Sequence, residues 1–133
     1  MDRGPVHETL DAFHAAAARA DADALLARFA TDGVFLGTDA TERWDGAAFR
    51  AFVAGRFAGG VGWTLATTRR AVEGHGDVAW FDEDLVHARM GPLRGSGVLV
   101  RGTDGRWRIA QYNLAVTVPN ARFEAVKAAI AAP

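Results

Sequence analysis

The stretch DGRWRIAQYNL, residues 104–114, decides the fold of this 133-residue chain. Asp104 and Gly105 are a turn signal, and the residues from 107 to 117 read as a strand. Residues 93–100 also read as a strand, so the two segments predict a β-hairpin. A two-residue loop would pair Thr103 with Arg106, and the hairpin would then align Val100 with Ile109, Val98 with Gln111 and Ser96 with Asn113.

This register sorts the hairpin into two surfaces, because side chains alternate between the faces of a strand. Alternation by itself does not say which surface faces the interior. One surface would carry Ser96, Val98, Val100, Ile109, Gln111 and Asn113, and the other Arg108, Ala110, Tyr112 and Leu114.

Two more strands precede the hairpin, at residues 63–72 and 78–89. The turns at 74–77 and 90–92 are short, so neighbouring strands must run antiparallel and form a curved meander. The strand at 34–37 is much shorter. We therefore expect a mostly β second half.

The first half has helical spacing instead. Apolar residues between 6 and 30 fit two helices with a break at 21–23, where Asp21 or Asp23 can cap the second helix. A third helix is predicted over 45–57, and residues 121–132 read as a short helix or a frayed tail. Helices followed by a meander predict an α+β fold with three helices packed on one face of a curved antiparallel sheet.

Composition limits the classes of function. With 50% hydrophobic and 23% charged residues, the chain fits one globular domain spanning 1–133. A net charge of -1 and no basic run longer than Arg69-Arg70 argue against nucleic acid as a partner. The absence of cysteine excludes disulfides and thiolate chemistry. No apolar segment predicts a membrane span or a secretory signal, so we expect a cytoplasmic protein with no membrane partner.

The order of elements and five stretches resemble the SnoaL-like branch of the nuclear transport factor 2-like superfamily, over nearly the whole chain. The resemblance implies a cone-shaped α+β fold, usually a homodimer, whose interior holds a small apolar or aromatic molecule. Members of that superfamily include ketosteroid isomerase, cyclases, dehydratases and non-catalytic binding modules, so the fold alone names no reaction. The stretches are FLGTDATERW, WFDEDL, RGSGVLVR, DGRWRIAQYNL and VPN.

By this resemblance, the surface that carries Ser96, Gln111 and Asn113 would be the cavity wall. Relatives often have a histidine where Asn113 stands and an arginine where Ser96 stands. The chain therefore lacks the usual imidazole base and the usual anion clamp at these positions.

The segment VAWFDEDLVH offers a carboxyl group instead. The resemblance places Trp80 and Asp82 on the cavity side. A carboxyl group that is desolvated beside an indole is suited to exchange a proton with a carbon acid, which makes Asp82 a candidate general base. In the alternative, the carboxylates lie on a solvated face, and Phe81 and Leu85 form the core face.

The segment FLGTDATERW places an acid, a base and an indole side by side, which a simple turn does not require. In the cone fold this loop would lie at the cavity mouth, where Glu42 and Trp44 could contact a ligand and Arg43 could bind its carboxylate. In the alternative, Asp39 and Thr41 cap turns, Glu42 and Arg43 form a surface ion pair, and Trp44 packs under the third helix or in a dimer interface.

No metal or cofactor site is predicted. His7 and His14 lie two helical turns apart, too far for the i, i+4 pair that ligates zinc. His14 is the histidine that could reach the cavity from the first helix. The sequence contains no nucleophile elbow, phosphate loop or dinucleotide fingerprint.

Two functions stay open. The first is an isomerase, cyclase or dehydratase that uses Asp82 as general base and Tyr112 or Asn113 as oxyanion donor. The second is a non-catalytic homodimer that binds a ligand or partner, with Phe81, Tyr112 and Leu114 on its convex dimer surface. The predicted ligand contacts in either case are Trp44, Trp63, Trp80, Glu42, Ser96, Gln111 and His14.

Overall fold

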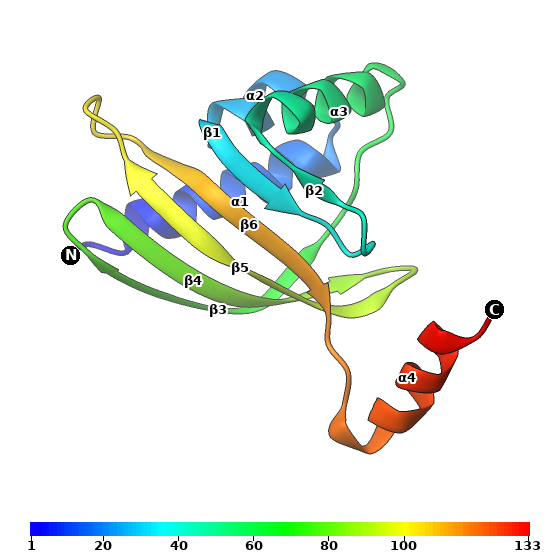
Figure 1. Cartoon of the computed structure of the whole chain (residues 1–133). Helices are drawn as coiled ribbons and strands as arrows, with labels where there is room; N and C mark the ends of the chain where they lie inside the picture. The colour runs from blue at the N-terminus through cyan, green and yellow to red at the C-terminus, as the bar shows by residue number, and fades with distance from the viewer.

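The computed structural model describes all 133 residues and has an α+β architecture, as predicted (Figure 1). One six-stranded sheet has the order β2-β1-β6-β5-β4-β3. β1 runs parallel to β6, and every other neighbouring pair is antiparallel. The strands are β1 Phe29–Leu36, β2 Arg43–Trp44, β3 Ala66–His75, β4 Val78–His87, β5 Gly91–Arg101 and β6 Trp107–Val116.

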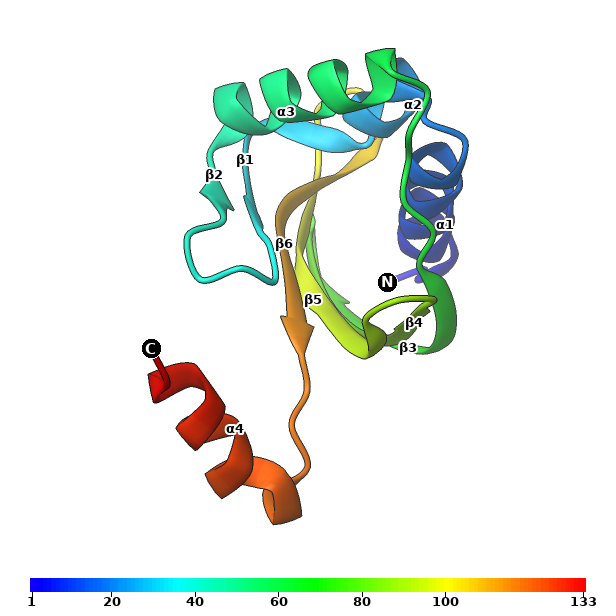
Figure 2. The ribbon, with the colours of Figure 1, turned by 90° about the vertical axis from the view of Figure 1, so that its right-hand side faces the viewer.

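Three helices in the first half cover the inner side of the curved sheet: α1 Gly4–Ala18, α2 Ala22–Ala27 and α3 Gly46–Ala58 (Figure 2). Asp21 caps α2 and Asp45 caps α3, each accepting a backbone N–H at 3.0 Å, so the predicted cap and third helix are confirmed. These caps fix where each helix starts over the sheet.

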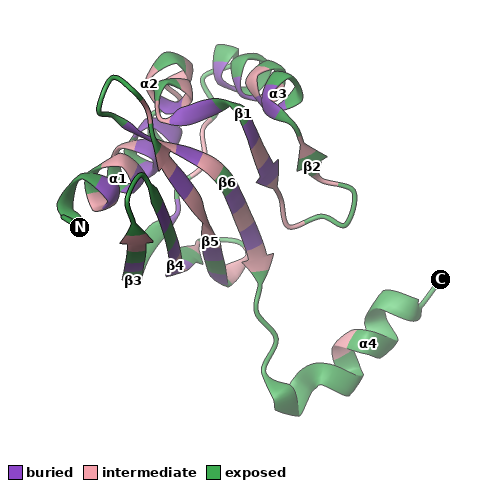
Figure 3. Ribbon diagram, turned by 60° about the vertical axis from the view of Figure 1, so that its left-hand side comes forward, coloured by how far each residue is buried: buried purple, intermediate pink, exposed green.

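The core lies between the inner sheet face and these helices. Buried residues alternate with intermediate and exposed ones along β4 and β6, whereas β3 at the sheet edge is mostly exposed (Figure 3). Tyr112 is fully buried, and its ring stacks on Phe35 at 5.5 Å and on Phe13 at 5.7 Å. An aromatic column therefore joins α1, β1 and β6.

The β5–β6 hairpin differs from its predicted form in its loop and at a bulge, and the two changes in strand register cancel. Its loop has three residues, because Gly102 pairs with Arg106 and Gly105 takes a left-handed conformation at φ 80°. Farther along, β6 contains one unpaired extra residue, Ala110, between the pairs Leu99–Ile109 and Val98–Gln111. The bulge restores the predicted pairs of Val98 and Ser96, whereas the predicted pair of Val100 with Ile109 is wrong.

Two strand starts and one additional strand also differ from the prediction. β1 begins at Phe29, five residues before the predicted start, β3 begins at Ala66 after an irregular connection, and the two-residue strand β2 was not predicted. β1 is longer because its first residues pair with β6 through an irregular register, which no local pattern reveals.

The C-terminal segment leaves the body of the protein. After β6 the chain forms a 3-10 turn, Asn120–Arg122, and the helix α4, Phe123–Ala131, which projects away from the sheet (Figure 1). Phe123 is 57% and Ile130 81% exposed. None of the helices combines the length and apolarity needed to cross a bilayer.

Candidate functional site

Asp82 lies on the outer face of the sheet. Its side chain is 51% exposed and forms an ion pair with Arg69, which also bonds to Asp84 at 3.0 Å. Trp80, on the same face, is 48% exposed. The prediction that this side of β4 lines the cavity is wrong, because Phe81 and the other alternate residues of β4 are the ones that pack against the helices.

Ser96, Gln111 and Asn113 lie on the same outer face as Asp82. Asp82 pairs with Ser96, and Ser96 with Asn113, so the three form one row across the strands. Tyr112 and Leu114 therefore face inward and cannot form the predicted convex dimer surface. Near this row, the prediction of which residues share a face is correct. The prediction of which face points inward is wrong, because Tyr112 and Leu114 are buried.

An open pocket of about 240 Å³ lies where the β1–β2 loop, α3 and the β4–β5 turn meet. It includes the predicted contacts Glu42 and Trp44, which lie just before and in β2, and Trp63, which lies in the connection between α3 and β3. Its lining residues are Phe35, Gly37, Thr38, Glu42, Trp44, Phe52, Arg56, Trp63, Leu65, His87, Arg89, Met90 and Leu114.

Aromatic rings form a continuous wall of the pocket. Phe52 stacks on Trp44 at 4.3 Å and lies 6.2 Å from Trp63, and Phe35 lies 6.1 Å from Trp44. The guanidinium of Arg56 lies over the Trp63 ring at 5.4 Å. The wall gives a planar apolar ligand large flat surfaces to contact.

Polar side chains of the β1–β2 loop form hydrogen bonds with the backbone of the same loop. Glu42 accepts the backbone N–H of Asp39 at 2.9 Å, and Asp39 accepts that of Thr41 at 2.9 Å. The Thr41 hydroxyl and backbone N–H hold the pKa of Asp39 below its usual value. The predicted cap at Asp39 is confirmed, and Trp44, in β2, contributes its aromatic ring to the pocket lining.

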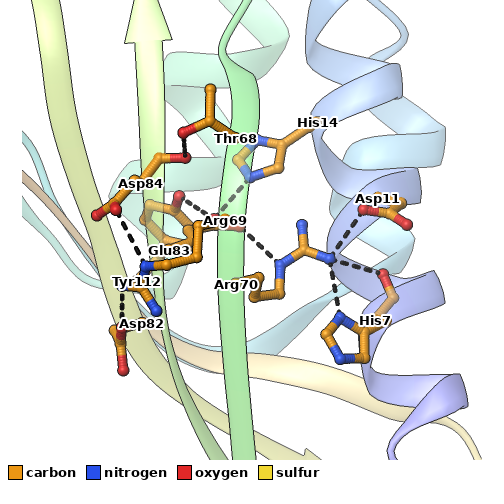
Figure 4. A network of polar contacts seen from close by, with 10 residues as sticks. All are labelled: His7, Asp11, His14, Thr68, Arg69, Arg70, Asp82, Glu83, Asp84 and Tyr112. Atoms are coloured by element: carbon orange, nitrogen blue, oxygen red, sulfur yellow. Dashed lines mark hydrogen bonds and ion pairs between the residues drawn. The ribbon is translucent and has the colours of Figure 1, made fainter.

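A buried polar cluster surrounds Glu83, which is fully buried (Figure 4). Glu83 accepts hydrogen bonds from the Tyr112 hydroxyl at 2.6 Å, His14 Nε2 at 2.8 Å and Arg70 Nε at 2.7 Å. The Arg70 side chain is 5% exposed and donates to Asp11 at 2.8 Å. His14 is thus held by Glu83 and does not line the pocket.

Opposing effects set the protonation of this cluster. Burial alone would raise the pKa of Glu83, but the hydrogen bonds and charges of His14, Tyr112 and Arg70 outweigh it and hold the pKa below its usual value. Burial and the adjacent carboxylate raise the pKa of Tyr112. Glu83 is therefore an ionised carboxylate that serves as a hydrogen-bond acceptor.

The sequence contained a signal for this cluster. His7, Asp11 and His14 recur at i, i+4 and i+7 on α1, and Arg70 contacts the first two while Glu83 contacts the third. A polar stripe on an otherwise apolar helix face predicts a buried polar partner.

Comparison with known domain families agrees with the observed fold. A model of the SnoaL-like domain matches residues 6–119. The chain belongs to the SnoaL-like domain family. Among solved structures, this SnoaL-like protein resembles a cystatin-like-fold protein of unknown function from Nostoc punctiforme, with 18% identity and a TM-score of 0.71 over 87% of this chain and 91% of that one. No curated protein matches it.

Two other similar structures have provisional enzyme names. One is a provisionally assigned dehydratase of the NTF2-like family from Streptomyces avermitilis, with 16% identity, a TM-score of 0.72 and coverage of 86% of this chain and 95% of that one. The other is a provisionally assigned ketosteroid isomerase from Parabacteroides distasonis, with 17% identity, a TM-score of 0.68 and 86% coverage of each chain. At these identities the SnoaL-like chain shares the fold with them.

Proposed function

We propose that this SnoaL-like protein binds a small, planar aromatic molecule in the pocket between the β1–β2 loop, α3 and the β4–β5 turn. The observation that carries the proposal is the aromatic wall formed by Phe35, Trp44, Phe52 and Trp63 along one side of an open pocket. Concave sites with apolar walls and a few polar groups are the usual form of small-molecule sites.

The size of the pocket narrows the ligand class. An apolar cavity of about 150 Å³ holds benzene, and drug-sized ligands occupy about 300–1,000 Å³. A volume of about 240 Å³ therefore fits a molecule of one or two rings. A four-ring steroid would need the pocket to widen.

The positions of the carboxyl groups favour a protein that binds its ligand without catalysing a reaction. Asp82 lies outside the pocket, in an ion pair with Arg69. Glu83 does not line the pocket, and its three hydrogen bonds with a lowered pKa make it a weak base. No carboxyl group is thus placed to take a proton from a ligand in the pocket except Glu42, which accepts a hydrogen bond from its own loop.

Tryptophan fluorescence offers a direct test. Naphthalene derivatives and other one- and two-ring aromatics are titrated into wild type, Trp44→Phe and Trp80→Phe, with calorimetry to confirm the affinities. We expect binding to change the emission of wild type and Trp80→Phe, and this change to shrink in Trp44→Phe, because Trp44 lines the pocket and Trp80 lies outside it. Absence of binding by every compound, or an equal loss of signal in both variants, would contradict the proposal.

A further inference from the structure

We infer that the pocket selects an anionic aromatic ligand of the carboxylate class, with Arg89 and His87 recognising the carboxylate at the mouth. This inference rests on the proposed function, since it names the ligand class of the same site. Three observations in and beside the β4–β5 turn carry it.

The first observation is a free guanidinium. Arg89 lines the pocket and is exposed, and no carboxylate or carbonyl of the chain accepts a hydrogen bond from its side chain. Arg101 bonds to Asp77 at 2.7 Å and Arg108 to Asp104. The guanidinium groups of Arg43, Arg94, Arg106 and Arg122 are unpaired too, but none of these residues lines the pocket. A free guanidinium at a pocket mouth can receive a carboxylate through two parallel hydrogen bonds.

The second observation is the tautomer of His87. Its Nδ1 accepts the backbone N–H groups of Arg89 at 3.2 Å and Met90 at 3.1 Å, so the neutral ring must carry its proton on Nε2. Nε2 has no hydrogen-bond partner in the chain and His87 lines the pocket. The turn therefore presents a donor beside the free guanidinium.

The third observation is the charge of the lining. Arg56 and Arg89 supply two positive charges, and Glu42 is the single carboxylate among the lining residues. One oxygen of Glu42 already accepts the Asp39 N–H. The lining has an excess of positive charge, although the whole chain has a net charge of -1.

Together these groups fit a ligand that has an aromatic ring at one end and a carboxylate at the other. A ring would lie along the wall of Trp44, Phe52 and Trp63, and its carboxylate would extend to the turn that holds His87 and Arg89. A neutral analogue of the same shape would keep the ring contacts and lose the charge-assisted hydrogen bonds, which are stronger than neutral ones.

The experiment compares naphthoate with the neutral analogue naphthylmethanol by calorimetry, in wild type, Arg89→Gln, Arg89→Lys and Arg94→Gln. Arg94 is exposed on the outer face, next to Asp84 in the strand register, and is the matched control. We expect wild type to bind naphthoate about tenfold more tightly than naphthylmethanol. Arg89→Gln should lose that preference, Arg89→Lys should keep part of it, and Arg94→Gln should leave it unchanged.

The outcomes separate the inference from the proposed function. If both compounds bind wild type equally, or if Arg94→Gln weakens naphthoate as much as Arg89→Gln does, the carboxylate inference is wrong while the aromatic site stands. If neither compound binds any variant, the proposed function fails, and the inference fails with it. Because Arg89 is exposed and unpaired, loss of binding in Arg89→Gln would not be caused by misfolding.

Discussion

Glu83 is the residue on which the polar interior depends. It is fully buried and joins His14, Arg70 and Tyr112, which come from α1, β3 and β6. A buried charge is tolerated only where donors replace the water it has lost, and here three donors do so. One side chain thus ties the first helix to three strands of the sheet.

We therefore expect Glu83→Gln to lower the free energy of unfolding by about 3–5 kcal/mol, because the buried Arg70 loses its buried counter-charge and keeps only the solvent-exposed Asp11 as a carboxylate partner. Urea denaturation followed by circular dichroism measures the loss. Asp82→Asn is the matched control on the neighbouring residue, and it should change stability little since its ion pair is solvent-exposed. Equal losses in both variants would refute the central role of Glu83.

Glu83→Gln should also change how the stability of the protein depends on pH. The folded-state pKa of Glu83 is lowered from its ordinary value of 4.5, so its contribution is present above that value and is lost as the pH falls through the folded pKa. Wild type should therefore lose stability on acidification below about pH 4.5, by more than Glu83→Gln does. Parallel curves for the two proteins would show that other carboxyl groups dominate acid unfolding.

At the scale of the element, β5 shows how glycine makes room for this cluster. A Cβ added at Gly95 would clash with the Tyr112 hydroxyl and press on the Glu83 side chain. Gly95 pairs with both Glu83 and Leu114, so the strand cannot simply move aside. The glycines of the segment GSG are therefore a packing requirement as well as a means of bending the sheet.

Gly95→Ala should lower the free energy of unfolding by about 1–3 kcal/mol through overpacking, as measured by thermal or urea denaturation. Gly55→Ala is the control, because a Cβ there meets no atom within 4 Å and lies within α3. That substitution should be neutral or slightly stabilising. A neutral Gly95→Ala would mean that Tyr112 can leave Glu83 at little cost.

The elements also show what the sequence could and could not predict. The helices, the meander and the cap at Asp21 followed from local spacing and cap chemistry, and those predictions are confirmed. The face of β4 did not follow, because Trp80 and Phe81 are both apolar and alternation gives no sign of direction. The bulge at Ala110 depends on pairing with another strand, which no local pattern specifies.

The pocket was predictable in part. Glu42, Trp44 and Trp63 were expected near a ligand and do line the pocket. Phe52, His87 and Arg89 were missed, since they come together only when α3 and the β4–β5 turn approach the β1–β2 loop. Whether any of these residues contacts a ligand stays a prediction.

At the scale of the whole molecule, α4 stands apart. It contacts mainly the 3-10 turn that precedes it and has no buried residue, and a nine-residue helix is marginal in water without packing. Removal of residues 119–133 should therefore leave the midpoint of thermal unfolding and the tryptophan emission essentially unchanged. A drop of several degrees would mean that α4 packs against the body or against a second copy in solution. Light scattering on both proteins would distinguish these two cases and test the predicted homodimer.

The burial of Tyr112 has a spectroscopic consequence. It is the single tyrosine of the chain, and burial beside Glu83 raises its pKa above the ordinary value of about 10. Tyrosinate absorbance in an alkaline titration will therefore come from one known position, and it will appear only as the core opens. The four tryptophans do not ionise in this way, so they report other regions. The protein thus contains a natural optical probe of its core, without any label.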